Sequence, residues 1–519
     1  MMERFLFRFP KSASFLLGGL AALGFPPLQL WPVALLAMGL FVLVVQRAET
    51  WRRALLLGWL FGISHFTLTN NWIATAFTHQ SEMPEFLGWL AVPLLALYLA
   101  IYPALAAAGA QRFAPTDRPL VFALVFAGLW IVTEWLRSWV FTGYAWAPFS
   151  LTLLGHEAVP GLAMLLPWFG TYALSGFAIL IGISVVALFA GRRFIPALAI
   201  AALVTAGMYL PRGEREEGTL RYTVVQPDLD QRELNDPREY EPAFLTLSAL
   251  STRKDGSAER VVFWPESGLP DYLREGYPER YYRATTAGGD PLLARARIGQ
   301  VLDDTSMLLT GAVDLEIEGE RAKAAYNVVT ALDTNGTIAA GYRKAHLVPY
   351  GEYLALRWLL EPLGATRLVA GTIDFWPGPG PATLDLGLYG RAGIQICYEI
   401  VFSGQVTDRD ERPDYIFNPS NDGWFGLWGP PQHFAQARMR AIEEGLPVIR
   451  STTTGISGVI DADGIVRASL GSRKMDALHG FIPPAKQPTL FSRLGNVLAL
   501  LWAGFFLALS LVAMRRRRG

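Results

Sequence analysis

Cys397 is the only cysteine in the 519-residue chain, and its neighbours make it a candidate for chemistry. It ends the apolar run at residues 393–396 and is followed at once by Tyr398 and Glu399. A single thiol cannot form a disulfide within the chain. Two interpretations remain, a small buried hydrophobic residue or a nucleophile.

Two further polar residues lie where apolar segments end. Glu266 closes the apolar run 261–266, and Lys344 precedes the turn at residues 349–351. A neutral thiol is a poor nucleophile and needs a base or a cation beside it. Glu266 can accept the thiol proton, while Lys344 can lower the thiol pKa and stabilise an oxyanion. The three residue types predict acyl transfer through a thioester on Cys397, without a histidine.

The composition predicts two unlike parts. Hydrophobic residues make up 52% of the chain and charged residues 17%, which is too apolar for an ordinary soluble protein. The excess lies at residues 12–210 and 490–514. We expect a transmembrane bundle at 1–210, a globular domain at 211–488, and a C-terminal transmembrane helix with a basic tail at 489–519.

The apolar stretches predict eight membrane spans, because about 20 apolar residues cross a bilayer. A cleaved signal peptide is the alternative for the first stretch, but no small-residue cleavage site precedes the second. The expected spans are 12–24, 27–45, 54–77, 87–110, 119–140, 161–190, 194–210 and 490–514.

The basic residues predict the orientation of the bundle. With eight spans, the basic clusters all fall on one side of the membrane, and the alternate loops contain no Lys or Arg. The positive-inside rule makes that side cytoplasmic. Both termini are then cytoplasmic, and residues 211–488 lie on the opposite face. The clusters are Arg4 to Lys11, Arg47 to Arg53, Arg112 with Arg118, Arg192 with Arg193, and Arg515 to Arg518.

The globular part shows apolar runs of strand length alternating with helical patterns, which predicts a layered α/β domain. No glycine-rich phosphate loop or Cys/His metal spacing occurs, so we expect no cofactor, no metal and no nucleic-acid partner. The expected strands are 220–226, 261–266, 307–313, 326–332, 393–399, 415–418, 447–451 and 459–461. The expected helices are 239–251, 292–302 and 433–445.

Glu266, Lys344 and Cys397, in this order and these settings, resemble the catalytic site of the nitrilase superfamily, whose Glu-Lys-Cys residues lie in an αββα sandwich. Within it, nearly the whole chain is similar to the bacterial apolipoprotein N-acyltransferase family, which joins a membrane bundle to a periplasmic nitrilase-like domain. The similar segments are Lys344 to Glu352, Cys397 to Glu399, Asn418 to Gly426, Gln432 to Phe434, Arg438 to Ala441, Glu134 to Arg137 and Phe141 to Trp146.

The resemblance implies a multi-pass enzyme of the bacterial inner membrane. It implies a ping-pong reaction that moves an acyl chain from a glycerophospholipid, by resemblance phosphatidylethanolamine, to the α-amine of the diacylglyceryl-cysteine of an apolipoprotein. The enzyme is expected to be a monomer. A membrane-tethered amidase or nitrile hydrolase, with water as the second nucleophile, is the alternative. A transporter or scaffold is disfavoured because the triad is complete.

The resemblance also implies roles around the triad. Glu352 supports the lysine and the reacting carbonyl, and Glu399 is a hydrogen-bond acceptor or an ion-pair partner. The remaining candidates for a substrate pocket are Tyr350, Tyr398, Trp424 and Phe425, and packing is the alternative for the last three. After Gln226 the family tends to show a tryptophan that this chain lacks, and Tyr240 is the candidate replacement.

Two features at the membrane carry open alternatives. Glu134 and Arg137 are three residues apart on one helix face, either as a structural pair or as a phospholipid headgroup contact. Within residues 353–375, an apolar stripe at helical spacing is either a core helix or an arm that dips into the membrane. The stripe consists of Leu354, Trp358, Leu359 and Leu363.

Overall fold

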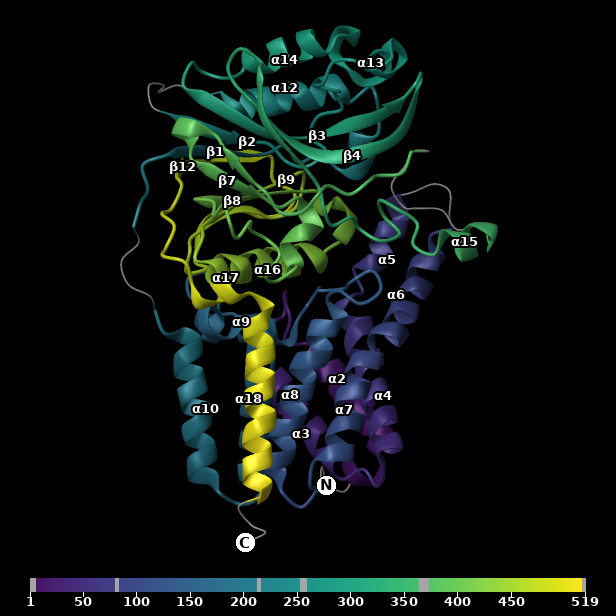
Figure 1. The fold of residues 1–519 in the computed structure, drawn as a ribbon, viewed down its shortest axis with the longest axis vertical. Helices are drawn as coiled ribbons and strands as arrows, with labels where there is room; N and C mark the ends of the chain where they lie inside the picture. The colour runs from purple at the N-terminus through teal and green to yellow at the C-terminus, as the bar shows by residue number, and fades with distance from the viewer. Residues whose placement is uncertain (1–5, 80–83, 212–215, 253–258, 364–372, 516–519) are drawn as a thin grey trace.

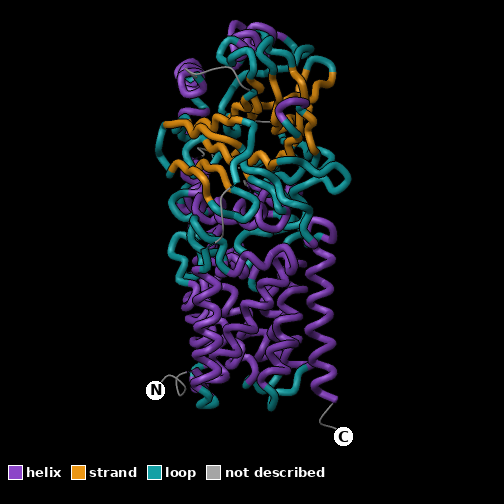
Figure 2. Tube along the Cα trace, turned by 90° about the vertical axis from the view of Figure 1, so that its left-hand side faces the viewer, coloured by secondary structure: helices purple, strands orange, loops and turns teal. Residues whose placement is uncertain are grey.

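The computed structural model describes residues 6–79, 84–211, 216–252, 259–363 and 373–515. Apolar helices form one end of the molecule, and two β-sheets with their covering helices form the other (Figure 1). Both ends of the chain lie at the end of the bundle remote from the sheets (Figures 1 and 2). This architecture confirms the predicted helical bundle joined to an α/β sandwich.

Every predicted span coincides with helix, although four are interrupted. The stretch 161–190 has a non-helical residue at Gly170, and the stretch 490–514 is broken at Gly495. The stretch 54–77 bends after Thr69, and the stretch 87–110 is broken at Ala100, three residues before Pro103, which lacks a backbone N–H. The bundle helices are α2 (Pro10–Ala22), α3 (Trp31–Gln46), α4 (Trp51–Thr69), α5 (Ile73–Ala76), α6 (Phe86–Leu99), α7 (Ile101–Phe113), α8 (Pro119–Arg137), α9 (Leu166–Ala190), α10 (Phe194–Tyr209) and α18 (Asn496–Arg515).

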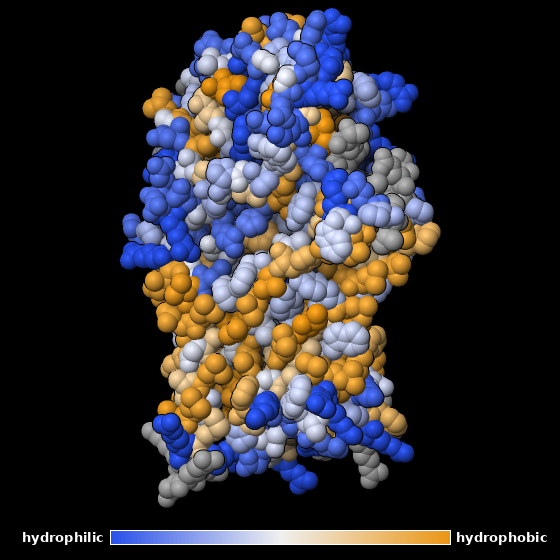
Figure 3. Space-filling view, turned by 45° about the vertical axis from the view of Figure 1, so that its right-hand side comes forward, coloured by the Kyte–Doolittle hydropathy of each residue, from blue (hydrophilic) through white to orange (hydrophobic). Residues whose placement is uncertain are grey.

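Four helical segments among the described residues are long and apolar enough to cross a membrane: Phe86–Phe113, Pro119–Arg137, Leu162–Ala190 and Asn496–Arg515. The other apolar helices pack closely against them. A Cβ on Gly182 of α9 would lie 2.2 Å from the carbonyl oxygen of Leu35 in α3. Small residues of this kind let membrane helices approach each other. Apolar side chains cover the sides of the bundle, while polar ones gather at its far end and on the sheet domain (Figure 3).

The sheets form a sandwich. One has the order β12-β1-β2-β3-β4-β5, and the other β11-β10-β9-β8-β7-β6. Their inner faces meet at the rings of Phe263 and Phe417, whose centroids are 4.8 Å apart. The strands are β1 (Arg221–Gln226), β2 (Arg260–Phe263), β3 (Ser306–Glu318), β4 (Arg321–Leu332), β5 (Ile338–Arg343), β6 (Thr383–Asp385), β7 (Arg391–Ile394), β8 (Tyr415–Ser420), β9 (Val448–Thr452), β10 (Ser457–Ile460), β11 (Val466–Leu470) and β12 (Asp476–Phe481).

Helices cover both outer faces and complete the four layers. The helices α12 (Tyr240–Ser251), α13 (Glu279–Thr285) and α14 (Pro291–Gly299) lie on the face away from the bundle (Figure 1). The helix α16 (Gly429–Glu444) lies between the second sheet and the bundle, where it packs against α9. Tyr240 begins α12, in the outer layer.

The apolar runs predicted most strands, because strands buried on both faces read as continuous apolar segments. One prediction is wrong at the site itself. The run 393–399 is not a single strand, since β7 ends at Ile394 and residues Cys397–Val401 form a 3-10 helix, η7. The strands β5, β6, β11 and β12 were not predicted, and each of them contains half-exposed or exposed positions.

Candidate active site

Cys397 is the first residue of η7, at the sharp turn that follows β7. Its φ angle is +51°, in the left-handed region that residues other than glycine rarely adopt. The thiol is buried, and the side chain is 4% exposed. Strained positions of this kind occur at functional sites, where surrounding contacts hold them. The turn therefore marks Cys397 as more than a packing residue.

Glu266, Lys344 and Glu352 meet in one buried cluster. Lys344 Nζ lies 3.4 Å from Glu266 Oε1 and 3.0 Å from Glu352 Oε1. The amide of Asn327, on β4, donates to both carboxylates at 2.7 and 3.0 Å. Each charged group is therefore paired and hydrogen-bonded, which buried charges require.

The strands position this cluster through their backbones. Lys344 follows β5 directly, and its backbone N–H donates to the carbonyl of Asn327 at 2.8 Å. Glu266 lies three residues beyond β2, against Gly311 of β3. A Cβ on Gly311 would lie 2.7 Å from the Cα of Glu266, so only glycine fits there. Asn421 directly follows β8 of the second sheet, and its backbone N–H donates to Glu266 Oε2 at 2.9 Å.

The electrostatics place Cys397 with this cluster. Burial raises the pKa of the Cys397 thiol, the Glu266 carboxylate raises it further, and Lys344 lowers it, with a net pKa well above the ordinary value. Burial would lower the pKa of Lys344, but Glu352 and Glu266 outweigh it and raise that pKa. These shifts favour the neutral thiol of Cys397 and the charged ammonium of Lys344. Lys344 lowers the thiol pKa, as expected, but burial and Glu266 raise that pKa by more.

Glu399 is a hydrogen-bond acceptor that joins the lysine segment to the cysteine turn. Its Oε1 accepts from the hydroxyl of Tyr342 at 2.8 Å and from the backbone N–H groups of Ala345 and His346 at 2.7 and 3.1 Å. Its Oε2 accepts from the N–H of Ile396 at 2.8 Å. Of the two predicted alternatives, the geometry favours the acceptor over the ion-pair partner.

We expect Glu399→Gln to destabilise the fold. The amide NH₂ of Gln would face at least one of the N–H or O–H groups that now donate to the Glu399 carboxylate. The loss should be about 1–3 kcal/mol of unfolding free energy. Chemical denaturation followed by tryptophan fluorescence measures it. The exposed Glu411→Gln, which disturbs only a 3.6 Å ion pair with Arg391, serves as the control and should leave the midpoint unchanged. Equal midpoints for both variants would contradict this role of Glu399.

The four predicted pocket residues do not share one environment. Phe425 is 7% exposed and packs against the rings of Trp72 and Trp146 at 4.8 and 5.6 Å. Tyr398 is buried against Phe402, with ring centroids 5.0 Å apart. Trp424 is only partly buried, and Tyr350 is 37% exposed with a φ angle of +63°. Phe425 and Tyr398 therefore pack, while Tyr350 and Trp424 have surface free for contact.

Glu134 and Arg137 are buried, at 5% and 2% exposure, with Nη2 and Oε1 3.9 Å apart. Arg137 Nη1 donates to the carbonyl of Trp146 at 2.8 Å, and Glu134 Oε1 accepts from the N–H of Phe149 at 2.9 Å. The pair therefore holds the segment after α8 in place. This geometry favours the structural alternative over a headgroup contact.

The predicted apolar stripe at 353–375 is not a core helix. Leu354 is buried, but Trp358 and Leu359 are 75% and 45% exposed on the short helix α15 (Arg357–Leu360). The side chain of Leu363 and residues 364–372 lie outside the described residues. In Figure 1, α15 projects sideways at the level of the upper end of α6.

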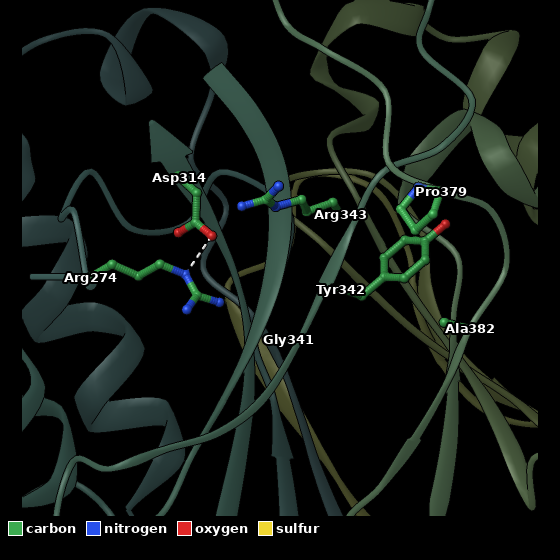
Figure 4. Close-up of a pocket in the computed structure, with 7 residues that line it drawn as sticks. All are labelled: Arg274, Asp314, Gly341, Tyr342, Arg343, Pro379 and Ala382. Carbon is green, nitrogen blue, oxygen red and sulfur yellow. Dashed lines mark hydrogen bonds and ion pairs between the residues drawn. The ribbon is translucent and has the colours of Figure 1, made fainter. Parts of the chain in front are cut away.

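A pocket lies beside β5, the strand that precedes Lys344. Arg274 and Asp314 form an ion pair at 2.6 Å on one side of it, and Arg343 points toward them (Figure 4). Its lining consists of Arg274, Asp314, Gly341, Tyr342, Arg343, Pro379 and Ala382. Tyr342 connects this pocket to the site through its bond to Glu399.

Sequence reasoning missed several residues that contact the triad or its turn. Asn327 carried a detectable signal, because it is a polar residue inside the apolar run 326–332. Asp422 and His433 lie in segments that resemble the family but carried no assigned role, and Arg450 lies in the strand predicted at 447–451. His433 Nε2 lies 3.0 Å from the carbonyl oxygen of Cys397, a contact across 36 residues that no local pattern indicates.

Comparison with known proteins matches both parts of the chain. A family model described as the apolipoprotein N-acyltransferase N-terminal domain matches residues 17–184, and one described as carbon-nitrogen hydrolase matches residues 231–484. The apolipoprotein N-acyltransferase of Bradyrhizobium diazoefficiens is 34% identical, over 96% of this chain and 94% of that protein. That of Rhodopseudomonas palustris is 31% identical, over 97% and 94%.

The chain belongs to the apolipoprotein N-acyltransferase family. The family predicted from the motifs is thereby confirmed. Both parts of the apolipoprotein N-acyltransferase architecture are present, because one family model covers bundle helices and the other covers the sandwich.

Solved structures are more distant. An amidase from Nesterenkonia sp. is 15% identical with a TM-score of 0.32, covering 52% of this chain and 93% of its own. The C. elegans NitFhit protein is 18% identical with a TM-score of 0.36, covering 57% of this chain and 65% of its own.

Proposed function

We propose that this protein transfers an acyl chain from a glycerophospholipid, with phosphatidylethanolamine as the expected donor, to the N-terminal α-amine of the diacylglyceryl-cysteine of apolipoproteins. Cys397 is the nucleophile, Glu266 the general base, and Lys344 the cation that stabilises the oxyanion. Glu352 holds Lys344. The observation that carries the proposal is the buried Glu266–Lys344–Glu352 cluster beside the Cys397 turn, in a domain that sits on apolar helices.

The first half-reaction forms the thioester. Glu266 takes the proton of the neutral Cys397 thiol as sulfur attacks the ester carbonyl, and the Lys344 ammonium stabilises the oxyanion of the tetrahedral intermediate. The bond from carbonyl carbon to glycerol oxygen then breaks. Glu266 returns the proton to that oxygen, and the lysophospholipid leaves.

The second half-reaction uses the same groups. The acceptor amine attacks the thioester carbonyl and gives a proton to Glu266. The bond from carbonyl carbon to sulfur breaks, an amide is released, and the proton returns to Cys397. Because Lys344 is also paired with Glu352, it keeps its charge while Glu266 carries the proton.

Intact-mass spectrometry tests the thioester directly. After incubation with phosphatidylethanolamine vesicles, we expect the protein mass to increase by one acyl group, and the increase to disappear when a diacylated lipopeptide is added. A thioester that is discharged equally fast by water alone would favour the amidase alternative. No mass increase with any phospholipid would contradict the proposal.

We further propose that residues 1–210 and 489–519 lie in the inner membrane, with residues 211–488 in the periplasm and both termini in the cytoplasm. The described basic residues Arg52, Arg112 and Arg193 support this, since the helix ends next to them all lie at the end of the bundle remote from the sheets (Figure 1). Arg4 and Arg516 to Arg518 lie outside the described residues. Protease added to intact spheroplasts should cleave within 211–488 and spare a C-terminal tag. Cleavage of the tag alone would reverse the orientation.

The exposed helix α15, which carries Trp358 and Leu359, should contact lipid. We expect the double change Trp358→Ser and Leu359→Ser to slow thioester formation in liposomes with little effect on the unfolding midpoint, because neither side chain is buried in the fold. The control replaces two exposed apolar residues of the outer layer, Leu292 and Leu293, by Ser. A midpoint loss in proportion to the activity loss would show that the arm packs on the protein instead.

A further inference from the structure

His433, on α16, contacts the backbone of Cys397. The ring is fully buried, and its Nε2 lies 3.0 Å from the carbonyl oxygen of Cys397. A carbonyl oxygen only accepts, so Nε2 carries the proton of this hydrogen bond. The amide of Asn418 donates to the carbonyl of Gln395 at 2.5 Å, two residues earlier. The backbone of the cysteine turn is thus held by side chains that do not touch the thiol.

The orientation of the His433 ring is fixed by two charged groups. Its Nδ1 lies 2.9 Å from Asp422 Oδ1 and 3.0 Å from Arg450 Nη2. Arg450 and Asp422 pair with each other at 2.7 Å, and all three side chains are buried. Burial would raise the pKa of Asp422, but Arg450 and His433 outweigh it and lower that pKa to about 2. Asp422 therefore stays ionised and holds the Arg450 guanidinium, and the unprotonated Nδ1 of the ring accepts from Arg450 Nη2.

The same ring is packed against the membrane bundle. Trp146, in the segment after α8, lies 5.2 Å from the His433 ring, measured between centroids. The indole Nε1 of Trp146 donates to Gln432 Oε1 at 2.8 Å, and Gln432 Nε2 donates to the carbonyl of Pro26 at 3.1 Å. The next turn of α16 continues the contact, since Gln436 accepts from the N–H of Ala147.

We propose that His433 is a positioning residue for Cys397, and that Trp146 makes this positioning depend on the seating of the catalytic domain on the bundle. The left-handed φ of Cys397 needs support from its surroundings, and the His433 hydrogen bond supplies it at the carbonyl of the same residue. A thiol misplaced by about 1 Å costs about 100-fold in rate. The inference rests on the proposed nucleophilic role of Cys397.

Two amide variants test the hydrogen bond. In His433→Gln the amide nitrogen reaches the position of Nε2, whereas in His433→Asn it reaches only that of Nδ1. We expect His433→Gln to form the acyl-enzyme within about threefold of the parent rate, and His433→Asn to be about 10- to 100-fold slower at saturating phospholipid. The phospholipid concentration at half-maximal rate should stay unchanged in both. Phe434→Leu, a change on the same helix away from the cysteine, controls for lost packing.

Thiol alkylation by iodoacetamide, followed by intact mass, separates this inference from the proposed function. If Cys397→Ala still acquires an acyl group, the nucleophile assignment is wrong. If Cys397→Ala is inactive but the Gln and Asn variants alkylate and acylate at equal rates, only the positioning role is wrong. Slowing in proportion to a loss of unfolding midpoint, as expected for Phe434→Leu, would likewise overturn it.

A double-mutant cycle tests the connection to the bundle. Trp146→Leu should slow acyl-enzyme formation in the parent, and should have little further effect in the His433→Asn background, because both changes act on the same contact. Additive effects of the two substitutions would show that Trp146 does not act through His433.

Discussion

Cys397→Ala is expected to abolish the acyl-enzyme while leaving the fold intact. Without the sulfur no thioester forms, so intact mass after incubation with phospholipid should show the unmodified protein only. Cys397→Ser should be nearly as inactive, because a hydroxyl has a much higher pKa than a thiol and gains less from the same base and cation. The loss is the largest expected for a single side chain.

The control for this result is the unfolding midpoint of each variant. Removing one sulfur atom leaves a small cavity in a buried turn, so the midpoint should stay close to that of the parent. If Cys397→Ala retains substantial turnover with a normal midpoint, the nucleophile lies elsewhere and the proposed function loses its chemical basis.

Part of the candidate site was predictable, because some of its reactive residues come directly after apolar segments of the sequence. Glu266 lies three residues beyond β2, which is buried throughout and therefore legible as an apolar run. Lys344 follows β5, which has exposed positions, and was found from the turn after it and from the family motif. The family motifs then placed Glu352 and Glu399. The two-part fold was predictable for a similar reason, since apolar segments of membrane length and alternating strands and helices are local patterns.

What could not be predicted depends on contacts between distant segments. His433 approaches the Cys397 carbonyl only because α16 packs across the second sheet, and Asn327 reaches both carboxylates only once β4 pairs with β5. The helical pattern after Tyr353 predicted a stripe but not its burial, because amphipathic spacing does not say what covers the apolar face. The net pKa of Cys397 could not be predicted either. It depends on burial and on the distances to Glu266 and Lys344, which only the tertiary structure sets.

Glu266→Gln and Lys344→Met should both stop turnover while changing the thiol in opposite directions. Each should slow acyl-enzyme formation by about 100- to 10,000-fold, because one removes the base and the other the oxyanion partner. The Glu266 carboxylate raises the pKa of the Cys397 thiol and Lys344 lowers it. Glu266→Gln therefore lowers that pKa and increases the thiolate fraction near neutral pH, whereas Lys344→Met raises the pKa and decreases it.

Iodoacetamide alkylation measures this difference, because only the thiolate reacts. In the parent the raised pKa of Cys397 predicts slow alkylation at pH 7 that accelerates continuously as the pH rises toward that pKa. The curve should shift to lower pH in Glu266→Gln and to higher pH in Lys344→Met. The exposed Lys486→Met controls for a lost surface charge and should superimpose on the parent.

The stability of Lys344→Met needs its own measurement, since the change leaves Glu266 and Glu352 buried without their cation. Breaking such a pair costs about 3–5 kcal/mol, so alkylation is compared at a temperature where the unfolding curve shows the variant folded. Shifts of the same sign in both variants would mean that the charges of Glu266 and Lys344 do not set the pKa of the thiol. The assignment of Glu266 as base and Lys344 as cation would then have to be abandoned, even if turnover is lost in both.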